Sequence, residues 1–138
     1  MKSLPQSCEE CFKEFTIALD NLRNLTKRNK SDEFKDSHAR ELLTGFEVAH
    51  ELGLKVITKY FQKQGKGPFS GSRDLTVEAF HADLIDDGKA WLDIVIDRIQ
   101  YNPVYSIDSQ SKFLENIATK YLRLLNRFED TMGKKLEA

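Results

Sequence analysis

The sequence lacks most of the patterns that identify whole classes of protein. No apolar run approaches the roughly 18 residues that a membrane span requires, and the start of the chain has no apolar stretch typical of a secretory signal. There is no glycine-rich phosphate loop, no H-E-x-x-H metal motif and no nucleophile elbow. The formal net charge is -1, so the chain as a whole does not attract nucleic acid or anionic lipid. We therefore expect a cytoplasmic protein with no cofactor, no bound metal and no membrane association.

Cysteine is also scarce, with only Cys8 and Cys11 in the stretch CEEC. This spacing occurs in redox pairs and in halves of zinc sites. A redox pair is expected after a strand, whereas helical periodicity follows here. A zinc site needs two more ligands, but the histidines His38, His50 and His81 are scattered singly. Residues three apart share one face of a helix, so we interpret both cysteines as buried or half-buried helix residues.

Apolar residues recur at three- and four-residue steps along most of the chain, and no segment alternates with period two. The pattern predicts two long helices, over residues 7–28 and 37–64, and then a short helix with Ser72 as its N-cap. A fourth helix is capped by Asp86 or Asp87 and stopped by Pro103. The last helix is capped by Ser106 or Asp108, and its apolar stripe comprises Phe113, Ile117, Tyr121, Leu124, Leu125, Phe128 and Met132. We therefore predict one all-α domain over residues 1–138. Its simplest packing is an up-down four-helix bundle in which the third and fourth helices form one broken arm.

Two residues in these helices indicate where the core is tightest. Gly53 lies inside the second helix, where glycine costs about 1 kcal/mol relative to alanine, and close approach of another helix would be one reason for it. Trp91 is the only tryptophan and is expected to anchor the core. The helix that carries it is expected to bury Leu92, Ile94, Val95 and Ile99 as well.

A polar strip follows one side of the second helix, where Glu47, Glu51 and Lys55 lie four residues apart. One interpretation is a solvated ladder of ion pairs, each contributing a few tenths of a kcal/mol. The other is a strip that lines a groove. A lone histidine beside such a strip is more often packed or hydrogen-bonded than catalytic, and we interpret His50 and His81 in that way.

The stretch DRIQYNPVYS, residues 97–106, places an arginine and two tyrosines at a break between helices. Arg98 is near a helix C-terminus, where a cation is favoured by the helix dipole. Tyr101 and Tyr105 flank the break at Pro103. An arginine at such a corner also suits a phosphate, because the guanidinium offers fixed bidentate donors. The residues alone leave both interpretations open.

Two longer stretches resemble a known family. GFEVAHELGLKVITKYF, residues 45–61, and GSRDLTVEAFHADLIDDGKAWLDIVIDRIQYNPVYS, residues 71–106, are similar to the signature of the nucleotidyltransferase substrate-binding proteins. The resemblance covers about residues 43–106. It implies a small four-helix bundle of the HEPN superfamily that forms a homodimer with a shared groove around the corner at the end of the fourth helix. Such proteins are commonly encoded beside a minimal nucleotidyltransferase.

The resemblance implies two kinds of activity. Some members are nucleotide- or substrate-binding subunits, and others resemble metal-independent RNase toxins that the partner neutralises. The toxin motif is an arginine, four residues, a histidine, one residue and a tyrosine. Arg98 and Tyr105 occupy the arginine and tyrosine positions, but Pro103 stands at the histidine position, and Ile99 replaces the usual polar residue. Proline has no titratable group, and general acid–base help contributes about 10²–10⁴-fold. His50 or Glu51 is a conceivable substitute base.

We therefore expect a dimeric binding partner of a separately encoded minimal nucleotidyltransferase, without catalytic activity of its own. Its nucleotide- or partner-binding residues would be Arg98, Tyr105, Glu47, Glu51 and Lys55. One alternative is an RNase of the HEPN kind with a degraded motif of Arg98, Pro103 and Tyr105, which would act on RNA and form a toxin–antitoxin pair with the nucleotidyltransferase. A bundle with a purely structural role is the third hypothesis.

Overall fold

The computed structural model describes residues 7–27, 36–102, 104 and 110–137. All the regular structure in these residues is helical. The elements are α1 (Cys8–Lys27), α2 (Asp36–Lys63), α3 (Ser72–His81), α4 (Gly88–Gln100), α5 (Ser111–Asn116), the π-helical turn η2 (Ile117–Tyr121) and α6 (Leu122–Glu137). The predicted helices therefore exist, with ends that differ from the prediction by a residue or a few.

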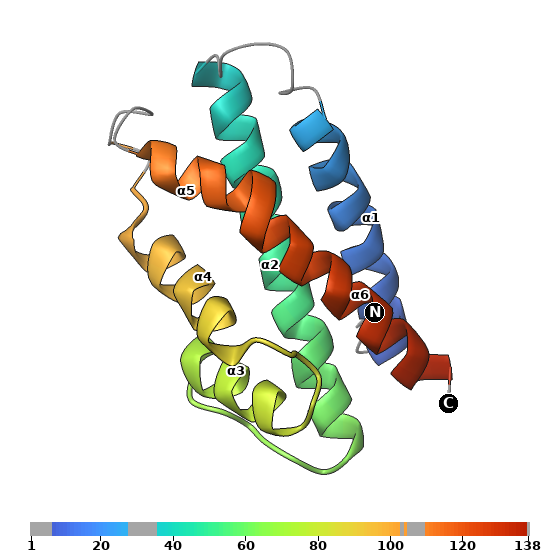
Figure 1. The fold of residues 1–138 in the computed structure, drawn as a ribbon. Coiled ribbons are helices and arrows are strands. Elements are labelled where there is room, and N and C mark those ends of the chain that lie inside the picture. Colours follow the sequence, from blue (N-terminus) through green and yellow to red (C-terminus); the bar gives the residue numbers. More distant parts are fainter. Residues whose placement is uncertain (1–6, 28–35, 103, 105–109, 138) are drawn as a thin grey trace, which may run out of the picture.

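The helices form a bundle with four arms, as the sequence predicts (Figure 1). Helices α1 and α2 run antiparallel and pack against each other. The last arm begins with α5 beside α2 and ends with α6 against α1. Helix α3 packs against α2, and α4 packs against α3 and η2. The prediction of an all-α bundle with α3 and α4 together as a broken arm is confirmed.

The last arm is one continuous helix that contains a π-helical turn. Asn116 and Leu122 on either side of η2 both have right-handed helical backbone, so the chain continues from α5 into α6 without a break. A π turn places one additional residue in a helix. The apolar stripe predicted for this arm is nevertheless buried at every position from Phe113 to Met132.

Aromatic rings join three of the arms in the core. Phe15 on α1 meets Phe128 on α6 edge to face, with ring centroids 5.3 Å apart. Trp91 on α4 contacts the same Phe128 ring at 5.4 Å and is fully buried. The expectation that Trp91 anchors the core is confirmed. Cys8 and Cys11 are also buried in α1 as free thiols, as interpreted from the sequence.

Gly53 lies where α2 is in close contact with both α1 and α6. A Cβ atom at this position would be 3.3 Å from Cε1 of Phe15 on α1 and 3.6 Å from Cε2 of Phe128 on α6. The first distance is tighter than ordinary van der Waals contact. The sequence suggested close approach of another helix as a reason for this glycine, and the structure shows such an approach.

The start of α3 and one face of α4 differ from the prediction. Ser72 is the first residue of α3 and not its N-cap. Gly71 is the N-cap, with φ of 95°, a value that glycine adopts without strain. Ile99 is 77% exposed, so the expectation that it faces inward is wrong. The buried side of α4 passes through Trp91, Ile94 and Val95. One turn on, Arg98 takes the inward position and Ile99 is rotated towards solvent.

The ends of α4 agree with the sequence. The Asp87 carboxylate accepts a hydrogen bond of 3.0 Å from the backbone N–H of Ala90, which makes Asp87 the N-cap. The helix ends at Gln100, and Tyr101 is extended. Pro103, the predicted cause of this end, lies outside the described residues, as do Ser106 and Asp108. The N-cap of α5 is Gln110.

Across the described ranges, no helix combines the length and the apolar character that crossing a membrane would require.

Candidate functional site

Arg98, in the last turn of α4, reaches across to α2 and meets a histidine and two glutamates there. Its Nη1 donates to Nδ1 of His50 at 2.9 Å and to Oε2 of Glu51 at 2.8 Å. Its Nε lies 4.0 Å from Oε2 of Glu47, which is too far for a hydrogen bond. This Nε is buried and has no hydrogen-bond partner among the described residues. With 22% of its side chain exposed, Arg98 is held against α2 and is not freely solvated.

His50 is packed in the core, and Arg98 fixes its tautomer. Its ring stacks on Phe46 at 6.0 Å and is tilted against Trp91 at 5.8 Å. Burial and the charge of Arg98 lower the pKa of His50 to about 3, so the ring is neutral near pH 7. A guanidinium has only donors, so Nδ1 accepts and we assign the proton to Nε2. The lone pair that a general base would need is therefore bonded to Arg98.

The two glutamates differ in how firmly they are held. The Glu47 side chain is 34% exposed and lies at the long distance from Arg98, whereas the Glu51 side chain is 67% exposed and makes the direct ion pair. Glu51 thus pairs with a residue of another helix, so the polar strip is not confined to α2. Two carboxylates face one guanidinium and a neutral histidine, which leaves this group of four side chains with an excess of negative charge.

A hollow of about 380 Å³ opens beside Arg98, and its lining residues are His50, Glu51, Ser72, Val95, Arg98 and Ile99. A second hollow of about 510 Å³ continues along α2 and is lined in part by Lys55, Thr58 and Leu75. Glu51 and Ser72 line both hollows. Glu51 and Lys55 of the strip therefore border hollows between α2 and the arm formed by α3 and α4, whereas Glu47 lines neither hollow.

Asp97, the residue before Arg98, connects α4 to the π turn. The hydroxyl of Tyr121 donates to the Asp97 carboxylate, and Nζ of Lys120 lies 3.4 Å from Oδ2 of Asp93. Burial and the hydrogen bond to Asp97 raise the pKa of Tyr121, so its hydroxyl stays protonated and can donate. These contacts fix the end of α4 from which Arg98 projects. Sequence reasoning missed Asp97 and Tyr121, although two acidic residues four apart on a largely apolar helix were a usable signal.

The rest of the corner is described only in part. Tyr101 is half-buried and its ring contacts Phe113 on α5 at 6.0 Å. The backbone N–H of Val104 donates to Oδ1 of Asn102 at 2.9 Å. Pro103 and Tyr105 lie outside the described residues. The structure thus brings together Arg98, Glu47 and Glu51 and places Lys55 in the adjoining hollow, while the position of Tyr105 stays a prediction.

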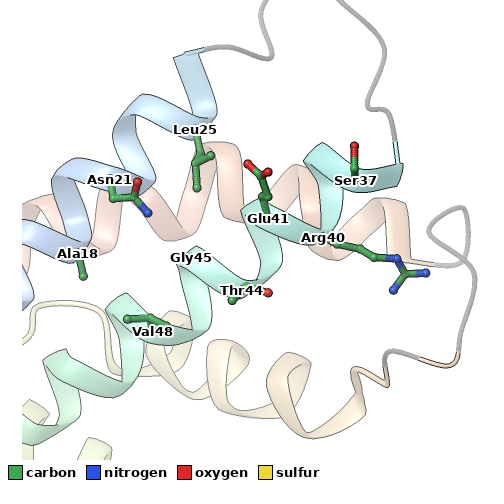
Figure 2. A pocket seen from close by; sticks show the side chains of 9 residues that line it. All are labelled: Ala18, Asn21, Leu25, Ser37, Arg40, Glu41, Thr44, Gly45 and Val48. Carbon is green, nitrogen blue, oxygen red and sulfur yellow. The ribbon is translucent and has the colours of Figure 1, made fainter.

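A further pocket of about 550 Å³ lies between α1 and α2 and was not predicted (Figure 2). Its lining comprises Ala18, Asn21, Leu25, Ser37, Arg40, Glu41, Thr44, Gly45 and Val48. The helices approach closely here, since a Cβ atom on Gly45 would lie 3.0 Å from Cδ1 of Leu25. Arg40 and Glu41 are adjacent charges of opposite sign, so the lining favours neither an anion nor a cation. The hollow beside Arg98, where charged groups of two elements converge, is the better candidate site.

The fold and this hollow define a class, that of small helical bundles with a charged groove between two of their arms. The family model described as nucleotidyltransferase substrate binding protein like matches residues 10–134, and the chain belongs to this family. The resemblance inferred from the two signature stretches is thereby confirmed. No curated protein matches the chain.

Proposed function

We propose that this chain is a nucleotide- or substrate-binding partner of a separately encoded minimal nucleotidyltransferase and has no catalytic activity of its own. The family supports an association with nucleotidyltransferases. The observation that carries the proposal is that His50, Glu47 and Glu51 converge on an arginine, Arg98, which lines a hollow. A half-buried arginine held at a cavity suits a phosphate-bearing ligand, whereas a purely structural bundle has no need of one there.

His50 supports binding over cleavage. It is the histidine nearest to the arginine among the described residues, and it would be the natural replacement for the base missing at Pro103. Its Nδ1 accepts from Arg98, however, and burial lowers the pKa of His50 so that the ring is neutral. Glu51 is ion-paired with the same guanidinium. Neither group is arranged to remove a proton from a ribose hydroxyl.

Co-purification tests the partner role. The tagged chain would be co-expressed with the nucleotidyltransferase encoded nearest to its own gene, and we expect a stable complex on size-exclusion chromatography. A matched control replaces Arg98 with lysine, which keeps the charge but loses the planar fork of donors. Absence of a complex, together with absence of nucleotide binding at high micromolar concentration, would contradict the proposal.

The RNase alternative rests on Arg98 and Tyr105 and has its own test. The purified chain, Arg98→Ala and Pro103→His would each be incubated with RNA. We expect no cleavage of RNA by the unmodified chain or by Arg98→Ala. Cleavage by the unmodified chain that disappears in Arg98→Ala would establish the enzyme and overturn the binding proposal.

The proposal includes a cytoplasmic homodimer. The support for the homodimer is exposed apolar surface on α4, where Ile96 and Ile99 lie three residues apart on one face of the helix. Exposed apolar groups that are grouped together, unlike single ones, indicate an interaction surface. This surface adjoins the hollow, because Ile99 also lines it.

A further inference from the structure

We propose that Glu51 occupies the place on Arg98 that a phosphate group of a bound nucleotide takes, so that the ligand enters by exchanging one anion for another. The inference rests on the proposed function, because it concerns how the same hollow admits its ligand. It assigns Glu51 a role different from that of a binding residue. Glu51 becomes a competitor that the ligand displaces, and it thereby sets which ligands are anionic enough to enter.

The charges around Arg98 require such an exchange. Glu47 and Glu51 both face the one guanidinium, and the neutral His50 adds no positive charge. A phosphate group carries well over one negative charge near neutral pH. Added to the present arrangement, it would meet an excess of carboxylates and would be repelled. Removing one carboxylate from Nη1 cancels this excess of negative charge and frees an N–H that points to the same position.

Glu51 is the group that can leave. His50 is stacked on Phe46 and packed by Trp91, so the other bond of Nη1 is anchored in the core. The Glu51 side chain is the most exposed of the group, and exposed ion pairs contribute little stability. It can rotate into solvent without disturbing the core. Glu47 is more buried and makes no hydrogen bond to Arg98.

The hollows give the exchange a place to occur. Glu51 lines both the hollow beside Arg98 and the one that contains Lys55. Its side chain therefore stands at the boundary between them, and its departure would join the two. A phosphate on Arg98 would then have the rest of a nucleotide extending along α2, past Ser72 and Lys55.

Calorimetric titration of the isolated chain with pyrophosphate, and separately with ADP, tests the inference. Glu51→Gln should bind both anions about three- to fivefold more tightly than the unmodified chain. Glu47→Gln removes the same charge from the same face of α2 and should gain no more than about twofold, because Glu47 does not occupy the Arg98 donors. Arg98→Gln should lose binding. A parallel gain for pyrophosphate and ADP would assign the effect to the phosphate group.

Several outcomes would overturn the inference. Equal gains in affinity for Glu51→Gln and Glu47→Gln would indicate general repulsion. No gain in affinity for Glu51→Gln, or no binding by either Glu51→Gln or the unmodified chain, would contradict the exchange altogether. In a chain with ¹³C-labelled glutamate, the Glu51 carboxylate signal should move towards its solvent value when pyrophosphate is added, and an unmoved signal contradicts displacement. These measurements need no partner, so a failed co-purification with this binding pattern intact would refute only the partner role.

Discussion

His50 is a titratable residue whose charge is decided by its neighbours. Phe46 and Trp91 remove it from water, and Arg98 donates to its Nδ1. Protonation would bring two cations into contact inside the bundle and would break that hydrogen bond. The neutral form is therefore part of the folded structure, and the low pKa of His50 follows from burial first and from Arg98 second.

Acidification should destabilise the fold through His50. Its pKa is about 3 in the folded chain and near 6.5 when unfolded, so between these values the unfolded state takes up the proton. Stability is fully present above about pH 7 and falls as the pH drops through this window, by about 1.4 kcal/mol per pH unit for this one group. Urea unfolding at pH 7 and pH 4.5 would measure the loss.

The matched variants are His50→Gln and His81→Gln. The first removes the titration and should lose less free energy of unfolding between the two pH values than the unmodified chain does. The second changes an exposed histidine on α3 and should leave the pH dependence unchanged. A His50→Gln chain with the full acid dependence would show that other groups cause it.

Candidate residues of the site could be named from the sequence, but their contacts could not. Charge and spacing single out Arg98, Glu47 and Glu51, the family resemblance implies a binding role for them, and the structure brings them together. The bond between Arg98 and His50 joins residues 48 apart in the chain. Periodicity describes one helix at a time, so it does not determine which faces of α2 and α4 meet. Ile99 was placed inward for the same reason.

Helix α2 is the element on which the other arms are assembled. It packs against α1, α3 and α5 and carries both the core residue His50 and the two carboxylates that face Arg98. Gly53 lets Phe15 and Phe128 lie against its backbone. Regular periodicity made α2 predictable, because a helix of 28 residues repeats its apolar pattern many times. The π turn η2 was not predictable, since no residue pattern in the sequence marks it.

Substitutions at Gly53 should separate helix propensity from packing. Gly53→Ala gains about 1 kcal/mol in propensity but crowds Phe15, at a cost of about 1–3 kcal/mol, so we expect a small net loss of stability. Gly53→Leu should destabilise by several kcal/mol, because its side chain has no space between α1 and α6. Thermal unfolding would measure both. Lys59→Ala, on the same helix as Gly53, is a suitable control. Gly65→Ala is not, because Gly65 has a positive φ. A Gly53→Leu chain that is more stable than the unmodified chain would contradict the close packing of α1 and α6 against Gly53.

The molecule has its charged groove and its exposed apolar residues near one another. The hollow beside Arg98 includes Ile99, and Ile96 is exposed one turn earlier on α4. A second copy that covered these residues would also border the groove. In that arrangement, ligand binding and self-association would share a surface. The positions of these residues in the sequence do not indicate this.

Ile99→Glu should therefore weaken a homodimer. The residue is 77% exposed in the single chain, so the variant should fold with unchanged thermal stability when monomeric. Light scattering coupled to size-exclusion chromatography should give a dimer for the unmodified chain and a monomer for Ile99→Glu. Ile17→Glu is a matched control, because Ile17 is also exposed but lies on α1. A monomeric unmodified chain would refute the dimer.

The π turn makes the last arm unusually tolerant of a change in chain length. In a regular α-helix each residue turns the chain by about 100°, so deleting one residue from the middle of α1 would rotate part of its buried stripe into solvent. Within η2 the chain already carries one additional residue. Deleting Thr119, which is exposed, would convert the turn to ordinary α-helix while α5 and α6 keep their buried faces. The arm thus has a position where the chain could lose one residue without exchanging its core.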